Sequence, residues 1–255
     1  MTKAKDIRRN DIVEFINSRG DASFQQIKRA FPDVSEMTLR VDLKELDAQR
    51  RIIRAYGGAK SIKNALGADD PLNLRLERDA DAKMIIAEKA RTLISDDVST
   101  VFLDSGSTTT TFARIFPDHE RVVVTPSLTC ASELARLKEA EITQLGGNIN
   151  KKSLCVQGGR SVRELGRMHF EQVFLSTTAY ASGFGFTCEV DEQAALKRVA
   201  INQGDEIVML MDSHKVEKPG TFRFCGLDDL DVIVSDGQLP ASFCAACEEA
   251  GVRIL

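Results

Sequence analysis

Two short helical patterns separated by a tight break constrain this chain more than any other feature of its sequence. Apolar residues recur at helical spacing on both sides of the break, namely Phe24, Ile27 and Phe31 before it and Leu39, Leu43 and Leu46 after it. Pro32 and Asp33 end the first pattern, and Ser35 occupies the position of a helix N-cap. The sequence therefore predicts a helix-turn-helix over this stretch.

The outer face of the second predicted helix is polar. It presents Ser35, Glu36, Thr38, Arg40 and Lys44, whose side chains can contact base edges or phosphates. The second helix of a helix-turn-helix can enter the major groove of DNA. These five residues are therefore candidate DNA contacts.

A small basic wing is predicted directly after this helix, over residues 50–59. A basic and apolar stretch precedes Gly57-Gly58, and a second short stretch follows these glycines, which is the pattern of two strands joined by a glycine turn. Arg54, Gly57 and Gly58 are the candidate DNA contacts of the wing. Basic residues outnumber acidic ones over residues 1–62, whereas the whole chain has a net charge of −4, which suits an arm that neutralises phosphates. An ordinary solvated helical domain is the alternative.

These motifs resemble the winged helix-turn-helix of the DeoR family of bacterial transcription regulators, over roughly residues 5–60. Relatives usually carry a second basic residue where Val41 stands, so Val41 would offer DNA an apolar contact instead. The resemblance implies a DNA-binding regulator. The residues that carry it are Ser35-Glu36-Met37-Thr38-Leu39-Arg40, Asp42-Leu43 and Gly57-Gly58-Ala59.

Length and composition limit the remaining classes of protein. A chain of 255 residues, 43% of them hydrophobic, is long enough for one or two domains with a real core. No apolar run reaches about 18–20 residues, and the N-terminus has no apolar signal region, so we expect a cytoplasmic protein without a membrane segment. The six cysteines are scattered and the three histidines lie far apart. We therefore expect no metal site and no cofactor.

The larger part of the chain alternates between apolar strands and helical patterns. Residues 61–72 are interpreted as a linker, and residues 73–255 as a second domain that begins with a long helix over residues 74–94. This alternation is typical of a parallel sheet with helices on both faces. The predicted class is α/β, with a winged helix-turn-helix over residues 1–60 and a Rossmann-like, mainly parallel effector domain. Its strands are expected at residues 101–103, 122–124, 142–145, 172–175, 207–211 and 232–234. Helices are expected between the strands, one of them at residues 127–138.

Polar residues follow several of these strands, at the edge where ligands bind to such a sheet. The first strand leads into a glycine and hydroxyl-rich helix start that can surround a phosphate, and Asp104 there can accept hydrogen bonds from sugar hydroxyls. Singly, such segments are usually a helix cap, a turn or a surface loop. Their coincidence at the ends of successive strands favours a binding site. The candidate residues are Asp104, Gly106, Ser107, Thr108, Thr109, Thr125, Gly146, Gly147 and Lys215.

This pattern is similar to the effector domain of the DeoR family, whose fold resembles that of ribose-5-phosphate isomerase. The resemblance also includes Glu192 and Lys197 on a predicted helix. It implies that Gly106, Ser107, Thr108 and Lys215 hold a phosphate, that Asp104 and Glu192 face a polyol, and that Lys197 bridges acidic groups. One departure is Ser176-Thr177-Thr178-Ala179, where relatives usually carry a glycine-containing segment.

Together these features favour a transcription regulator, and we expect a repressor rather than an enzyme. Its partners would be double-stranded operator DNA and a phosphorylated sugar or related metabolite. Paired half-sites would require a homodimer or homotetramer. One alternative is a sugar-phosphate isomerase or a CoA-transferase-like enzyme with a DNA-binding arm. A purely architectural DNA binder is another.

Overall fold

The computed structural model describes residues 2–19, 21–49, 51–55, 57–61, 71–218 and 220–255. The chain divides into two compact units, residues 1–67 and 68–255. Most of the predicted linker, namely residues 62–70, lies outside the described residues, as do Arg50 and Tyr56 of the predicted wing. None of the described helices is long and apolar enough to cross a membrane.

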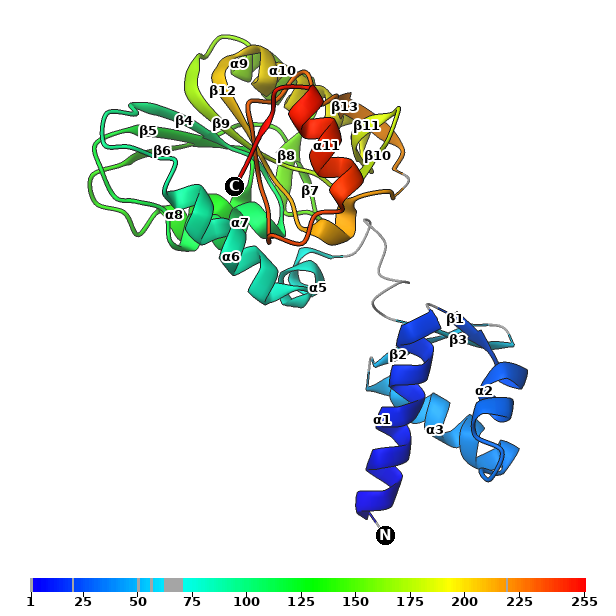
Figure 1. Ribbon diagram of the computed structural model, residues 1–255. Helices are drawn as coiled ribbons and strands as arrows, with labels where there is room; N and C mark the ends of the chain where they lie inside the picture. The colour runs from blue at the N-terminus through cyan, green and yellow to red at the C-terminus, as the bar shows by residue number, and fades with distance from the viewer. Residues whose placement is uncertain (1, 20, 50, 56, 62–70, 219) are drawn as a thin grey trace. The chain divides into compact units, whose positions relative to one another are not determined.

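Among its described residues, the smaller unit contains three helices and a small sheet (Figure 1). Both helices predicted for the helix-turn-helix are confirmed, as α2 (Phe24–Ala30) and α3 (Glu36–Ala48). Ser23 begins α2 with a reciprocal capping box to Gln26, and Ser35 caps α3 by accepting a hydrogen bond from the backbone N–H of Thr38. The cap residues thus set where each helix starts.

A longer helix, α1 (Thr2–Arg19), completes the core of this unit and was not predicted. Its surface is mostly charged, but Ile12 and Ile16 are fully buried among the leucines of α3 and their neighbours. The buried carboxylate of Asp42 on α3 accepts hydrogen bonds from Arg8 Nε (2.8 Å) and Arg9 Nε (2.9 Å). These ion pairs tie α1 to α3.

The wing is a two-stranded antiparallel ribbon that continues into a third strand. Strands β2 (Ile52–Ala55) and β3 (Gly58–Ser61) pair with each other, and β3 also pairs with β1 (Asp21–Ser23). Gly57 has φ +80°, which favours glycine, and a Cβ on Gly58 would lie 2.3 Å from the carbonyl oxygen of Ala22. Both glycines of the predicted turn are therefore required by the fold itself.

A seven-stranded sheet forms the centre of the larger unit, with every neighbouring pair of strands parallel. This confirms the predicted Rossmann-like architecture. Across the sheet, the order is β15 (Arg253–Ile254), β14 (Val232–Val234), β12 (Gly204–Leu210), β9 (Phe170–Ser176), β4 (Thr100–Leu103), β5 (Val122–Thr125) and β6 (Glu141–Gln144).

Helices cover both faces of this sheet (Figure 1). On one face, α6 (Ala80–Arg91), α7 (Ser107–Arg114) and α8 (Leu128–Leu134) enclose a core around Phe112 and Phe174. The other face carries α9 (Gly159–Leu165), α10 (Asp191–Asn202) and α11 (Ala241–Glu249). The strands are buried from both sides, which explains their continuous apolar sequences.

Several short elements surround the sheet and were not predicted. Strands β7 (Asn148–Asn150) and β8 (Cys155–Gln157) form a hairpin. A second antiparallel sheet contains β10 (Ala179–Ala181), β11 (Gly185–Cys188) and β13 (Phe222–Cys225). A single turn of 3-10 helix, η1 (Ser213–Lys215), follows β12. The segments next to β8, β9 and β12 contribute to the site described below.

The predicted long helix over residues 74–94 is wrong, because the chain breaks there into α5 (Leu72–Glu77) and α6. Arg78 leaves the helical conformation, and Asp79 adopts the left-handed one with φ +48°. Aspartate tolerates that conformation better than most residues. The break allows α5 to pack against α7 while α6 lies under the sheet. The helix expected at residues 127–138 is also shorter, since α8 ends at Leu134.

Candidate functional site

The outer face of α3 is the first candidate site. Arg40 is exposed there, its guanidinium 3.9 Å from Glu36 Oε2 and 4.3 Å from the centre of the Phe24 ring. Ser35 and Thr38 are engaged with each other, since their hydroxyls lie 2.8 Å apart. Arg40 therefore contacts both Glu36 and the Phe24 ring. The hydroxyl groups at the start of α3 serve mainly to cap the helix.

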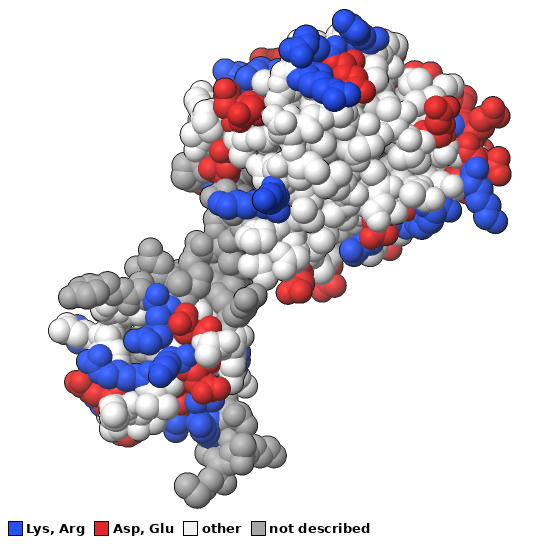
Figure 2. Space-filling view, turned by 180° about the vertical axis from the view of Figure 1, so that it is seen from behind, with Lys and Arg blue, Asp and Glu red and all other residues white. Residues whose placement is uncertain are grey.

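Further exposed side chains complete this face and the wing. Lys44 on α3 and Arg54 on β2 are exposed, and the backbone N–H of Arg54 is fixed by Asp47 Oδ1 at 2.9 Å. The space-filling view shows lysine and arginine side chains gathered over this unit with acidic ones between them (Figure 2). The predicted DNA contacts thus lie on an exposed and partly basic surface, and their contact with DNA stays a prediction.

A polar pocket in the larger unit is the second candidate site. It lies beyond the carboxyl ends of three neighbouring strands, β12, β9 and β4, and has a volume of about 420 Å³ including the part open to solvent. The described residues that line it are Arg75, Ser105, Gly106, Ser107, Thr108, Ser153, Ser176, Thr177, Thr178, Cys188, Gln193, Lys197 and Lys215.

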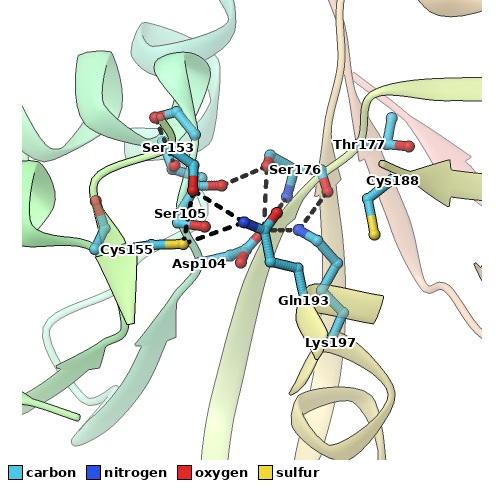
Figure 3. Close-up of polar contacts among 12 residues, drawn as sticks. Asp104, Ser105, Ser153, Cys155, Ser176, Thr177, Cys188, Gln193 and Lys197 are labelled. Atoms are coloured by element: carbon cyan, nitrogen blue, oxygen red, sulfur yellow. Dashed lines mark hydrogen bonds and ion pairs between the residues drawn. The ribbon is translucent and has the colours of Figure 1, made fainter. Parts of the chain in front are cut away.

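A buried ion pair forms the inner wall of this pocket (Figure 3). Lys197 Nζ on α10 contacts Asp104 Oδ2 at the end of β4, and it also donates to the carbonyl oxygen of Ser176 at 2.9 Å. The same carboxylate oxygen accepts the backbone N–H of Ser176 at 2.9 Å and its hydroxyl at 3.1 Å. Oδ2 of Asp104 is therefore fully engaged by protein groups, and Lys197 is the member of the pair that lines the pocket.

The start of α7 forms a second wall. Gly106 has φ +147°, and a Cβ there would lie 2.7 Å from Ser176 Oγ, so the turn requires glycine. Thr109 Oγ1 donates to the Gly106 carbonyl oxygen at 3.1 Å, whereas buried Thr108 Oγ1 has no hydrogen-bond partner among the described residues. Buried hydroxyls are seldom unpaired. Thr108 therefore offers a hydrogen bond to a molecule held in the pocket, beside the amides of a helix start.

Positive charge gathers at the third wall. Arg75 on α5 and Lys215 on η1 both line the pocket, and Lys215 Nζ lies 3.5 Å from Asp212 Oδ2. Burial, helped by the charge of Lys215, lowers the pKa of nearby Lys83 to about 8. Burial alone would raise the pKa of Asp212, but Lys215, Lys83 and His214 outweigh it and hold that pKa below its usual value. Arg75 and Lys215 thus bring positively charged side chains to the lining of the pocket.

Six of the predicted effector residues lie outside the lining, and Asp104, behind Lys197, is the first of them. The hydroxyls of Thr109 and Thr125 serve the backbone, since Thr125 Oγ1 accepts the N–H of Ser127 at 3.1 Å. Gly146 and Gly147 pack against the start of α9, and a Cβ on Gly147 would lie 2.3 Å from Ser161 Oγ. Glu192 is exposed on α10, and its neighbour Gln193 lines the pocket instead. The lining does include Gly106, Ser107, Thr108, Lys197 and Lys215.

Several lining residues were not among those predicted. Gln193 Nε2 lies 2.9 Å from Ser153 Oγ and 3.3 Å from Cys155 Sγ, which connects α10 to the segment before β8 (Figure 3). Arg75 belongs to α5, which the sequence pattern predicts as one continuous helix with α6. Ser176 and Thr177 were noted only as a departure from relatives. The sequence carries no local signal that brings Arg75, Ser153 or Gln193 to the pocket.

One grouping resembles a set of metal ligands. Oxygen and nitrogen atoms of Asp79, Asp212 and His214 lie within 4.8 Å of one another. Lys215 Nζ lies 3.5 Å from Asp212 Oδ2, and the charge of Lys83 also acts on this carboxylate. Two nearby ammonium groups oppose the binding of a further cation. The grouping is therefore better described as part of the charged wall.

Comparison with known proteins identifies both units. A family model of the DeoR-like helix-turn-helix domain matches residues 8–65, and one of the DeoR C-terminal sensor domain matches residues 78–237. The uncharacterized HTH-type transcriptional regulator YulB of Bacillus subtilis is 28% identical over 247 residues, covering 97% of this chain and 95% of that protein. The lactose phosphotransferase system repressor of Staphylococcus epidermidis is 26% identical over 231 residues, covering 90% and 91%. The solved structure of ribose 5-phosphate isomerase A from Methanocaldococcus jannaschii aligns with a TM-score of 0.39 and 14% identity, covering 55% of this chain and 56% of that one.

Proposed function

This chain belongs to the DeoR family of transcriptional regulators, and from that premise we propose that a phosphorylated sugar or related metabolite in the pocket controls its affinity for operator DNA. The operator would be bound by α3 and the β2–β3 wing. We infer a repressor without enzymatic activity that acts in the cytoplasm. A relative named as a lactose phosphotransferase system repressor supports the class of effector.

The observation that carries this proposal is the composition of the pocket around Thr108. An unpartnered buried hydroxyl, the first turn of α7 and two cations, Arg75 and Lys215, border one polar pocket. A phosphate group can interact with all of them at once, since it accepts hydrogen bonds from hydroxyls and amides and attracts cations. We therefore assign the phosphate to this end of the pocket.

The polyol end is assigned to the wall formed by α10. Lys197 and Gln193 both line the pocket and carry donors that suit sugar hydroxyls. Asp104 then acts through Lys197, by holding its ammonium group in place, rather than by contacting the sugar. The proposed contact of Glu192 with the effector would need a change of side-chain position, because Glu192 lies outside the lining.

The position of α5 offers a route by which the effector influences DNA binding. This helix follows residues 62–70 in the chain, and its Arg75 lines the pocket. The backbone N–H of buried Leu72 donates to the carbonyl oxygen of Lys152 at 2.9 Å, next to the pocket residue Ser153. A bound phosphate would strengthen the docking of α5, and the effector would thereby favour one conformation of the larger unit over another.

Self-association through the larger unit is part of this proposal. Operators read by helix-turn-helix proteins usually contain two half-sites, which a two-fold symmetric protein matches. A broad face of the larger unit carries few charged side chains (Figure 2), as expected for a surface buried between subunits.

A panel of small molecules tests the proposal directly. We would measure thermal stabilisation of the full chain by phosphopentoses and phosphohexoses and by their dephosphorylated counterparts, together with retention of a selected DNA duplex. Phosphorylated members should stabilise the protein and change DNA retention, whereas plain sugars should do neither. Equal effects of both sets would refute the phosphate assignment. Conversion of any sugar phosphate into an isomer would favour the enzyme alternative.

A further inference from the structure

Two large apolar side chains stand in solvent on the outer face of α3. Met37 is 71% exposed and Val41 is 49% exposed. They are four positions apart, so they lie one above the other on the same side of the helix. The inward face of this helix carries the buried residues Leu39, Leu43 and Leu46. Met37 and Val41 therefore contribute nothing to the core of the unit.

The surroundings of this pair favour DNA rather than another protein as its occupant. The next row of the helix surface contains Glu36, Arg40 and Lys44, all exposed. Arg40 is held over the Phe24 ring and beside Glu36, so its guanidinium is already ordered on the same outer face. An apolar stripe next to an ordered arginine matches the major groove, where base edges offer both acceptors and methyl groups.

The chemistry of the groove then limits what the stripe can recognise. The C5-methyl group of thymine is the apolar group exposed on base edges in the major groove. Four helical residues rise by about 6 Å, which corresponds to roughly two base-pair steps of about 3.4 Å. We propose that Met37 and Val41 read thymine methyl groups one to two base pairs apart in each operator half-site. This inference rests on the proposed DNA contact of α3, and it adds the bases that α3 prefers.

The experiment begins with selection of duplexes from a randomised pool by the full-length protein. Each recurring thymine of the selected half-site is then replaced by dU, which removes only the methyl group. Burial of one such group is worth about 0.8 kcal/mol, so each critical replacement should weaken binding about fourfold. Replacement of thymines outside the half-sites should leave the affinity unchanged and serves as the control.

Protein variants connect the methyl groups to the two side chains. Val41→Ala and Met37→Ala should each weaken binding to the thymine duplex and abolish the sensitivity to dU at one position. Both sites are exposed and alanine is a strong helix former, so the variants should fold, as circular dichroism can verify. Met84→Ala, at an exposed methionine of α6 in the other unit, is the matched control and should bind both duplexes as the parent does.

The possible failures are distinguishable. Enrichment of no duplex would overturn the DNA-binding function and this inference with it. Tight binding that is indifferent to dU at every position would overturn the thymine assignment and leave the regulator intact. Sensitivity to dU that persists in both alanine variants would also overturn it, because the methyl groups would then be read by other residues.

Discussion

The Asp104–Lys197 ion pair allows the sharpest test of how the pocket is held together. Asp104→Asn keeps the size of the side chain and its ability to accept hydrogen bonds from Ser176, but removes the negative charge. Only 5% of the Lys197 side chain is exposed, so its ammonium group would remain buried without a counter-ion. Breaking a buried pair in this way costs about 3–5 kcal/mol, a large part of the 5–15 kcal/mol by which domains are typically stable.

Urea unfolding of the full chain, followed by near-ultraviolet circular dichroism, measures this loss. With a denaturant slope of about 2–3 kcal/mol per molar urea, the transition of the larger unit should move down by about 1–2 M. Glu133→Gln is the matched control, since it breaks the exposed pair between Glu133 and Arg114, whose atoms lie 3.1 Å apart. Exposed pairs are worth at most about 1 kcal/mol, so the control should shift the midpoint far less.

A double variant separates the unpaired charge from any general damage. Asp104→Asn combined with Lys197→Met leaves no buried charge, so it should be more stable than Asp104→Asn alone. A loss below about 1 kcal/mol for Asp104→Asn would refute the reasoning. So would a double variant whose loss equals the sum of the two single losses, because the two groups would then contribute independently.

The remaining predictions concern DNA binding, effector binding, pH dependence and assembly. Arg40→Ala should weaken binding to a selected duplex by about 1–3 kcal/mol if the guanidinium reads a base, whereas a uniform loss on all duplexes with a shallower salt dependence would indicate a phosphate contact. Thr108→Val should weaken the binding of an active sugar phosphate, measured by calorimetry, by about 1–2 kcal/mol. Lys215→Ala should weaken this binding more and make it less sensitive to salt. Unchanged affinity in both variants would contradict the assigned position of the phosphate. Folding lowers the pKa of Lys83 to about 8, so between pH 8 and about 10.5 the unfolded state binds more protons than the folded state, and the free energy of unfolding increases with rising pH. Lys83→Met should remove this increase in denaturation curves recorded at pH 7.5 and 9.5. An unaltered pH dependence in the variant would contradict the lowered pKa. Light scattering of the full chain at micromolar concentration should give the mass of a dimer or tetramer, and a monomer would count against self-association through the larger unit.

Local periodicity was sufficient to predict the two helices of the DNA-binding unit and most strands of the large sheet. Ile27 and Leu39 are buried as their spacing requires, and the apolar runs around Phe102 and Val123 became central strands. Such patterns are readable because burial of one helix face or of both strand faces constrains neighbouring residues directly. The helix α1 escaped prediction because its apolar residues are few among charged ones.

The arrangement of side chains around the pocket depends on contacts between residues that are far apart in the chain. Asp104 and Lys197 are separated by 93 positions, and their pairing requires β4 to lie beside β9, an order that no local pattern contains. Arg75 reaches the pocket only because the chain breaks at Asp79 and α5 docks separately against α7. The sequence by itself therefore determined the two helices of the helix-turn-helix, most strands of the large sheet and the polar segments at the ends of those strands. Tertiary structure alone decided which polar groups neutralise one another and which remain available to a ligand, because burial and pairing are properties of the assembled sheet.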